Sequence, residues 1–190
     1  MATSLQNPIQ LQRYRALPAD MYEEVDPTPA RQPQLLELNR GLLAEFGHDT
    51  AWYESTEALG VLSGSAVIPS NAPIAMAYAG HQFGHWVPQL GDGRAHMLGQ
   101  LLAADGVAWD VQLKGSGRTR FSRGGDGRAT LGSVIREYVI SEAMAGLGIA
   151  TSRSLAIIAT GEPVPVSYTH LTLPTKESRG RSRWGGGQGS

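Results

Sequence analysis

The sequence from Gly91 to Glu137 reads GDGRAHMLGQLLAADGVAWDVQLKGSGRTRFSRGGDGRATLGSVIRE, and it decides the fold. It begins with a glycine turn, continues through two apolar segments that end at Lys114, and passes through a loop rich in glycine and arginine. A helical pattern that carries Glu137 follows. Glycine accepts backbone conformations that other residues avoid, which suits tight turns. The stretch predicts a glycine loop on a β-hairpin, a lysine at a strand end and a carboxylate on the next helix.

The two apolar segments predict paired strands. Residues 95–102 form the first, residues 103–106 contain the Asp-Gly pair typical of a hairpin turn, and residues 107–113 form the second. In the second strand, apolar residues alternate with Ala108, Asp110 and Gln112, which is the period of a strand with one buried face. Lys114 then falls on the face opposite Leu113, where it can reach over the glycine loop.

The loop from Gly115 to Arg128 concentrates positive charge. Five basic residues lie between Lys114 and Arg128, and Asp126 is the one acid among them. The loop repeats the tetrapeptide Gly-Asp-Gly-Arg of residues 91–94 at residues 125–128. Two copies could be two turns and nothing more. The functional alternative is that backbone N–H groups and arginines converge on a phosphate group.

Apolar periodicity predicts the remaining elements. We expect helices over residues 33–46, over residues 52–59 and from Thr130 to a glycine cap at Gly148. Residues 154–159 predict a strand that returns to the sheet, and residues 1–32 are expected to be irregular. The first helix is interpreted as a packing element.

His81 and His85 are four residues apart, a spacing that places two imidazoles on one helix face for a metal ion. Gly80 and Gly84 weaken such a helix, and no carboxylate follows at a useful offset. Structural histidines held by hydrogen bonds are therefore the expected interpretation.

The composition and length indicate a single globular domain or lobe and exclude several classes of site. The 190 residues suit one domain or one lobe, and 41% of them are hydrophobic, enough for a core. The absence of cysteine excludes disulfides, zinc-thiolate sites and a cysteine nucleophile in this chain. No apolar run has the length of a membrane span and no secretory signal is visible, so we expect a cytoplasmic protein. The Walker A pattern is absent, and the glycines of residues 91–99 do not form a Rossmann fingerprint.

Several contiguous motifs resemble the selenoprotein O family, whose bacterial members are the YdiU-type proteins. The similarity covers about residues 10 to 164. The motifs that carry it are YAGHQFGH at 78–85, QLGDGR at 89–94, QLKGSGRT at 112–119, SR at 122–123, GDGR at 125–128 and IRE at 135–137.

The resemblance implies an α+β fold of the protein-kinase-like N-lobe type, an antiparallel sheet with a Glu-bearing helix, whose second lobe is missing. It also implies an ATP-dependent protein adenylyltransferase that moves AMP to Ser, Thr or Tyr hydroxyls and holds ATP flipped relative to ordinary kinases. By this resemblance Glu137 supports Lys114 through an ion pair. The residues expected to bind ATP are Gly91, Gly93, Arg94, Lys114, Asp126 and Gly127.

The resemblance ends after residue 164. Residues 167–175, SYTHLTLPT, have no counterpart in the family and resemble a read-through segment, and a Gly/Arg-rich end follows. We therefore expect three parts: an irregular segment at 1–32, the kinase-like nucleotide-binding lobe with a helical extension at 33–164, and an artefactual or disordered tail at 165–190. An RNA-binding tail is the alternative for the last part.

In a kinase-like fold the catalytic Asp and the ligands of Mg come from the second lobe. The chain is therefore expected to bind ATP without metal ligands of its own and to be inactive alone. The expected partners are ATP and proteins with hydroxyl side chains, with no nucleic acid and no membrane. The competing hypothesis is a non-catalytic nucleotide-binding or interaction module.

Overall fold

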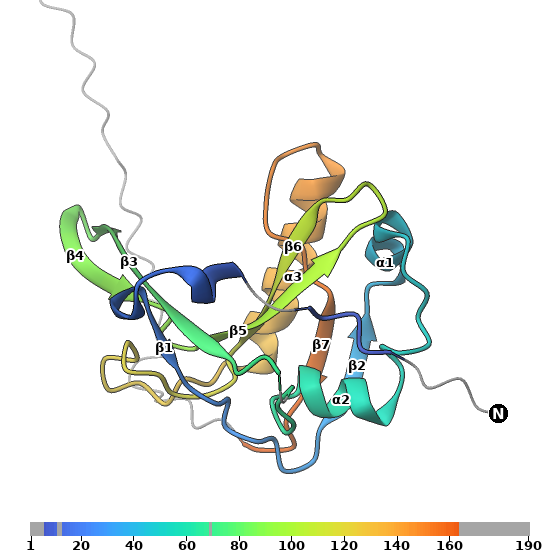
Figure 1. Ribbon diagram of the computed structural model, residues 1–190, viewed down its shortest axis with the longest axis horizontal. Helices are drawn as coiled ribbons and strands as arrows, with labels where there is room; N and C mark the ends of the chain where they lie inside the picture. Colours follow the sequence, from blue (N-terminus) through green and yellow to red (C-terminus); the bar gives the residue numbers. More distant parts are fainter. Residues whose placement is uncertain (1–5, 11–12, 69, 164–190) are drawn as a thin grey trace, which may run out of the picture.

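The computed structural model describes residues 6–10, 13–68 and 70–163, and in this part of the chain the fold is α+β with antiparallel sheets (Figure 1). A five-stranded sheet has the order β1-β3-β5-β6, with β4 paired to β3, and a separate two-stranded sheet joins β2 to β7. The strands are β1 (Tyr22–Glu24), β2 (Gln34–Leu38), β3 (Ile74–Gln82), β4 (His85–Gly91), β5 (Ala95–Leu102), β6 (Ala108–Lys114) and β7 (Ala156–Ala159). The helices are α1 (Arg40–Phe46), α2 (Thr56–Leu62) and α3 (Leu131–Gly146), with 3-10 turns at Arg13–Ala16 and Ala19–Met21.

The hairpin of β5 and β6 confirms the predicted pair of strands and their turn. Gly106 adopts a φ of 82° and donates its N–H to the carbonyl of Ala103 at 2.9 Å, so glycine serves the turn as expected. The pairing continues to the far end of the hairpin, where Ala95 lies opposite Lys114. Lys114 therefore stands at the end of the hairpin from which the 91–94 turn departs.

The predicted helix over residues 33–46 is wrong in its first part. Residues 34–38 form β2, and only residues 40–46 form α1. Asn39 separates the two: its Oδ1 accepts the N–H of Leu42 at 2.9 Å, and its Nδ2 donates to the carbonyl of Ser154 at 3.0 Å. The apolar pattern fits both a helix and a strand, and the partner that selects the strand lies far away in the sequence. Gly47 ends the helix as predicted, with a φ of 74°.

Three further predictions need correction. The strand at residues 154–159 forms as β7, but it pairs with β2 and does not return to the main sheet. The helix predicted at 52–59 begins at Thr56, because the Ser55 hydroxyl caps it by accepting the N–H of Ala58 at 3.1 Å. The N-terminal segment is not wholly irregular, because β1 pairs with β3 in the main sheet.

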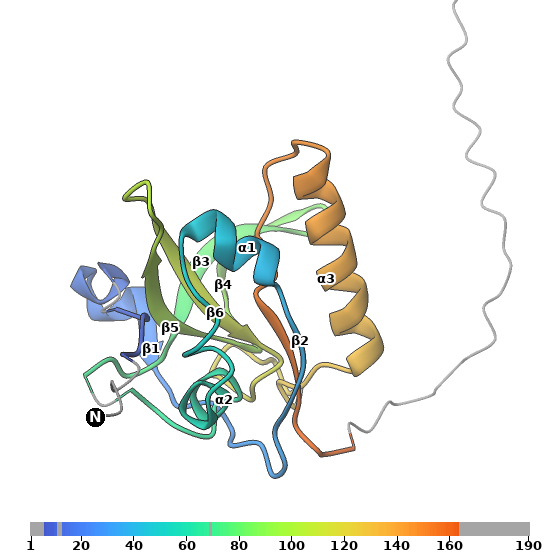
Figure 2. The same cartoon turned by 90° about the vertical axis from the view of Figure 1, so that its right-hand side faces the viewer.

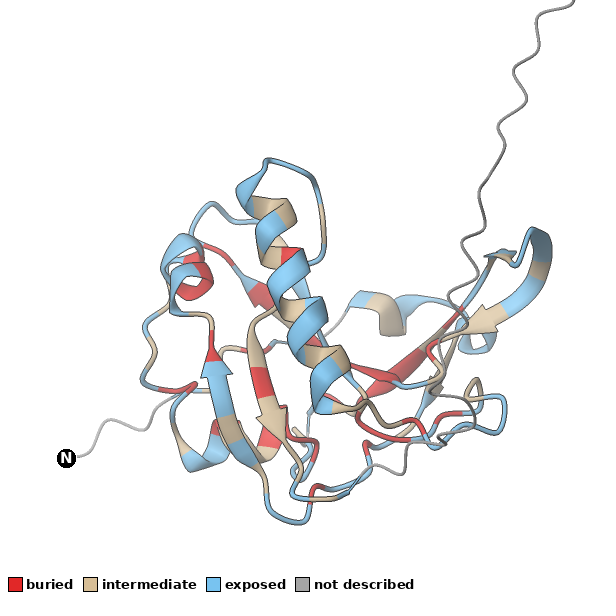
Figure 3. Cartoon of the chain, turned by 180° about the vertical axis from the view of Figure 1, so that it is seen from behind, coloured by how far each residue is buried: buried red, intermediate tan, exposed pale blue. Residues whose placement is uncertain are grey.

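The hydrophobic core lies between the β5–β6 hairpin, α1, α2 and β2. Its buried members include Leu38, Leu43, Val61, Leu98, Leu101 and Val111. α3 lies outside this core, beside β7 (Figure 2). Its only buried residue is Ser141, and Figure 3 shows most of the helix exposed or half-buried. The helix that carries Glu137 is therefore positioned mainly by contacts along one side.

Arg153 ties α3 to α1. Its guanidinium contacts the carboxylate of Glu142 at 2.8 Å and that of Glu45 at 2.8 Å. The Glu142 side chain is only 22% exposed, and it also accepts the N–H of Ser154 at 3.1 Å. Hydrogen bonds from Arg153 lower the pKa of Glu142 from 4.5 to about 2. This charged cluster fixes the end of α3 against the body of the fold.

The cluster predicts a pH-dependent stability. Because the pKa of Glu142 is depressed in the folded state, its contribution is present above pH 4.5 and lost as the pH falls towards about 2. The contribution is on the order of 2–3 kcal/mol. Urea unfolding of wild type and Glu142→Gln at several pH values should show that wild type loses this increment of unfolding free energy and the variant does not. Glu54→Gln, which removes a carboxylate from the exposed pair with Arg40, is the matched control; equal acid sensitivity of wild type and Glu142→Gln contradicts the assignment.

Two expectations from the sequence concern membrane spans and the tail at residues 165–190. No helix within 6–10, 13–68 and 70–163 has the length and apolar character needed to cross a membrane. The expectations for the tail at 165–190, including RNA binding, concern residues outside the described part and stay predictions.

Candidate functional site

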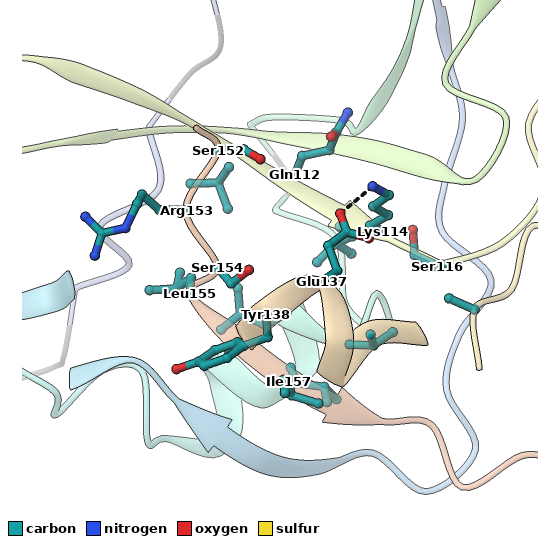
Figure 4. Close-up of a pocket in the computed structure, with 18 of the residues that line it drawn as sticks. Gln112, Lys114, Ser116, Glu137, Tyr138, Ser152, Arg153, Ser154, Leu155 and Ile157 are labelled. Carbon is teal, nitrogen blue, oxygen red and sulfur yellow. Dashed lines mark hydrogen bonds and ion pairs between the residues drawn. The ribbon is translucent and has the colours of Figure 1, made fainter. Parts of the chain in front are cut away.

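Lys114 and Glu137 form an ion pair between the end of β6 and the second turn of α3 (Figure 4). Their side chains are 49% and 46% exposed, so water screens the attraction and the pair adds little to stability. Its effect is geometric, because a flexible lysine is held in one direction by a carboxylate on a different element. The structure thus brings together two residues that lie 23 positions apart in the sequence.

A cavity of about 570 Å³ lies between β5, β6, β7 and α3, and the ion pair is part of its wall. Figure 4 shows Gln112, Lys114 and Ser116 along β6 and the start of the next loop, with Glu137 opposite. Apolar side chains such as Ile157 line the side formed by β7. The cavity therefore has a polar end and an apolar end.

Arg94 provides a second cation at the polar end. It precedes Ala95, which pairs with Lys114, and its carbonyl accepts the N–H of Gly115 at 2.7 Å. The Arg94 side chain is exposed and lines the cavity. Within the described residues its guanidinium has no hydrogen bond or ion pair to the protein. It is thus available to an anion.

The turn at residues 91–94 connects β4 to β5, and both of these strands pair with β3 and not with each other. Gly91 and Gly93 do not adopt positive φ. Glycine is required there by close approach: a Cβ on Gly91 would lie 2.3 Å from the Phe121 ring, and one on Gly93 would lie 2.8 Å from the Phe121 carbonyl oxygen. The turn is pressed against the loop that follows Lys114.

That loop contains Asp126 and Gly127, the remaining predicted ATP-binding residues. Asp126 is exposed, and its Oδ1 accepts the N–H of Arg128 at 2.9 Å. Gly127 has a φ of 71°, and a Cβ there would lie 2.0 Å from the carbonyl oxygen of Gly117. A bridge between Ser116 and Arg128 closes the base of the loop next to the cavity. The second Gly-Asp-Gly-Arg is therefore a bend held by the Asp126 side chain, and it is anchored close to Lys114.

The arginines of this loop do not converge as one phosphate site. Arg118 donates to the carbonyl of Gly125 at 2.6 Å within its own loop. Arg123 donates to Gln82, and Arg128 pairs with Glu162 at 2.9 Å. These three side chains stabilise the loop and its surroundings. The cations that line the cavity are Lys114, Arg94 and Arg153, and Arg153 is held by Glu45 and Glu142.

Asp92 is the residue that sequence reasoning missed. It was interpreted only as a turn former, yet it is buried with 8% exposure. Its Oδ2 accepts the N–H of Met76 at 3.2 Å and the Nε2 of Gln112 at 3.0 Å. Burial raises the pKa of Asp92, opposed by these hydrogen bonds, by one from Tyr78 and by the charge of Lys114. No local sequence signal distinguishes a buried Asp from a solvated one between two glycines.

His81 and His85 are not on a helix. They belong to the hairpin of β3 and β4, whose two-residue turn has φ values of 53° at Phe83 and 79° at Gly84. Both histidines are exposed, and the His81 ring lies edge-on to Trp86 at 5.2 Å. The expected hydrogen bonds to these imidazoles are not found among the described residues.

The residues near the cavity suit a phosphate anion better than a metal ion. No group of three or more metal-binding side chains occurs in the part of the chain that the structure describes. Magnesium needs oxygen ligands, usually carboxylates, and Glu137 is already engaged by Lys114. A magnesium site therefore does not fit the described residues by themselves.

The sequence matches the family described as Protein adenylyltransferase SelO over residues 7–168. It is similar to curated proteins named Protein nucleotidyltransferase YdiU. The relative from Shewanella denitrificans is 61% identical over 160 residues, which cover 84% of this chain and 32% of the relative. The relative from Bradyrhizobium sp. strain BTAi1 is 56% identical over 161 residues, covering 85% and 32%. That from Nitrobacter hamburgensis is 58% identical over 151 residues, covering 80% and 30%.

The chain thus spans about a third of the length of the curated relatives that it matches. The match includes the glycine turn, the lysine strand, the second loop and the helix with Glu137. This confirms the resemblance drawn from the motifs. The chain belongs to the SelO family of protein adenylyltransferases.

Proposed function

We propose that the protein to which this chain belongs is an ATP-dependent protein adenylyltransferase, and that residues 33–164 form its protein-kinase-like nucleotide-binding lobe. It would transfer AMP to Ser, Thr or Tyr hydroxyls of other proteins. The observation that carries the proposal is the Lys114–Glu137 ion pair next to Arg94 at the polar end of one cavity. Membership of the SelO family supports the type of reaction.

The chemistry explains why such a site needs fixed cations. The acceptor hydroxyl oxygen attacks the α-phosphorus of ATP, the bond from that phosphorus to the bridging oxygen breaks, and pyrophosphate leaves. The hydroxyl proton passes to a base that we expect outside this chain. Charge on the phosphate oxygens is stabilised by preorganised cations and N–H donors. Lys114, oriented by Glu137, and Arg94 would supply this charge.

The other expected contacts follow from their chemistry. Backbone groups at Gly91, Gly93 and Gly127 would approach the nucleotide without side-chain obstruction. Asp126 is an acid and would repel phosphate, so its expected contact is a hydroxyl or amino group of the nucleotide. The catalytic Asp and the magnesium ligands are expected in the two thirds of the relatives that this chain does not match. The chain alone would therefore bind ATP and transfer nothing.

Replacing Lys114 tests the proposal. We expect Lys114→Met to lower AMP transfer by about 100-fold or more, because a cation at the phosphates is lost. The assay uses a chimera in which residues 1–163 of this chain replace the matching part of the Shewanella denitrificans relative. It follows label from α-labelled ATP into protein, with γ-labelled ATP in parallel to detect phosphate transfer.

Arg40→Met is the matched control for this experiment. Arg40 forms an exposed ion pair with Glu54 at 2.6 Å on α1, so its loss removes a similar surface cation away from the cavity. Its chimera should transfer AMP at the rate of the unsubstituted chimera. Unchanged AMP transfer by Lys114→Met, or label arriving only from γ-labelled ATP, contradicts the proposal.

A non-catalytic nucleotide-binding module is the second candidate, because Lys114 and Arg94 at the cavity suit the binding of phosphate and carry no transfer chemistry by themselves. Under either candidate, the 190-residue chain should bind ATP without transferring label. Calorimetry should show binding that weakens at least 10-fold in Lys114→Met. The chimera then separates the candidates: label transfer supports the enzyme, and ATP binding without transfer supports the module.

A further inference from the structure

The carboxylate of Asp92 binds two strands of the main sheet, β3 and β6. Its Oδ2 accepts hydrogen bonds from the Met76 N–H on β3 and from Gln112 on β6, and the Tyr78 hydroxyl on β3 bonds to the same group. Asp92 itself lies in the turn that leads into β5. Gln112 is two residues before Lys114, on the same face of β6. The carboxylate therefore reaches the strand that carries the lysine.

The backbone around Asp92 is hydrogen-bonded to the 115–128 loop. The Thr119 hydroxyl donates to the Asp92 carbonyl at 2.6 Å, and both groups are buried. The Ser122 hydroxyl donates to the Gly93 carbonyl at 2.5 Å. The Phe121 ring occupies the space that a side chain at Gly91 would need. Three consecutive residues of the turn thus contact the loop segment 119–122.

We propose that Asp92 is a positioning residue that locks the 91–94 turn, the 115–128 loop and the β6 strand into one preorganised unit. The carboxylate holds the turn to the sheet, and the Asp92 carbonyl holds the loop to the turn. This fixes the backbone of Arg94, two residues on, relative to Lys114. Asp92 does not face the cavity as a lining residue, so it acts through its neighbours. The inference rests on the proposed function where it concerns ATP.

A purely structural role of Asp92 and a positioning role differ in what the removal of its carboxylate does. If the carboxylate only stabilised the fold, its removal would loosen the whole sheet. Positioning requires that its loss loosen the turn and the loop while the β5–β6 ladder stays intact. The ladder has its own backbone hydrogen bonds along the hairpin and its own core contacts through Leu98, Leu101 and Val111. The two roles are therefore separable by a residue-resolved measurement.

Amide hydrogen exchange on the 190-residue chain makes that measurement, with Asp92→Ala, Asp92→Asn and, as control, the exposed Asp20→Asn. In Asp92→Ala we expect at least 10-fold faster exchange at the amides of Met76, Phe121, Ser122 and Gly125, and less than 3-fold change within β5 and β6. Asp92→Asn keeps an acceptor oxygen in the same place, so it should stay within about 3-fold of wild type. Asp20→Asn should match wild type.

Thr119→Val gives an independent test if Asp92→Ala does not fold. It keeps the shape of the side chain and removes the hydroxyl that binds the Asp92 carbonyl. The same hydroxyl accepts the Phe121 N–H at 3.1 Å, so the readout is restricted to the amides of Ser122 and Gly125. These should exchange at least 10-fold faster, with the β3–β4 hairpin unchanged. Uniform acceleration over the whole sheet, or unchanged exchange in the 115–128 loop, overturns the positioning role.

ATP affinity supplies the second readout. The dissociation constant for ATP should rise at least 10-fold in Asp92→Ala and in Thr119→Val, and less than 3-fold in Asp92→Asn. If wild type binds ATP and all three variants bind equally well, the positioning role is overturned while the proposed function stands. If wild type does not bind ATP, the nucleotide-binding proposal fails for this chain, and the exchange pattern alone decides whether Asp92 locks the loops.

Discussion

The antiparallel pairing of β5 with β6 is the constraint on which the rest of this structure depends. The register places Ala95 opposite Lys114, so the residues that enter β5 and those that leave β6 lie at one end of the hairpin. The 91–94 turn and the 115–128 loop are therefore neighbours because of a strand register. A shift by one residue would turn Lys114 to the other face and away from Glu137. The core supports that register through Leu98 and Val111, which are buried on the hairpin.

The close approach of the two glycine segments follows from this arrangement. The turn and the loop leave the same end of the hairpin and must share space, and a side chain at Gly91 would occupy the position of Phe121. Gly91 and Gly93 are required by close approach, Gly106 by its positive φ, and Gly127 by both. Two identical tetrapeptides thus have different structural tasks. Residues 91–94 form a turn whose backbone is hydrogen-bonded to the neighbouring loop. Residues 125–128 form a bend in which Gly127 packs against Gly117 and accepts its N–H.

The sequence allowed good prediction where the pattern was local. The β5–β6 hairpin follows from alternation and an Asp-Gly turn, and α3 follows from its apolar period up to its glycine end. Prediction failed where a distant partner decides the state. Residues 34–38 fit a helix by spacing but form a strand with β7, more than 100 residues away. The β3–β4 hairpin is not predicted, because the i to i+4 spacing of His81 and His85 fits a helix as well as a hairpin with a Phe-Gly turn between them.

The charged residues at the site also divide into those whose role the local sequence predicts and those whose role only the fold shows. Counting bases in the 114–128 segment suggests five cations for phosphate, yet Arg118, Arg123 and Arg128 bind protein groups, and the Arg120 guanidinium lies over the Phe121 ring at 5.0 Å. A basic side chain in a glycine-rich loop can satisfy the carbonyls that such a loop exposes, and only the fold shows which task it performs. Lys114 differs because its partner is a half-exposed carboxylate, and water screens their attraction, so the pair adds little stability. The pair stabilises the fold little and lies at a cavity beside Arg94, whose guanidinium has no partner in the described part of the chain. It is therefore better explained by the positioning of a cation than by the folding of the chain.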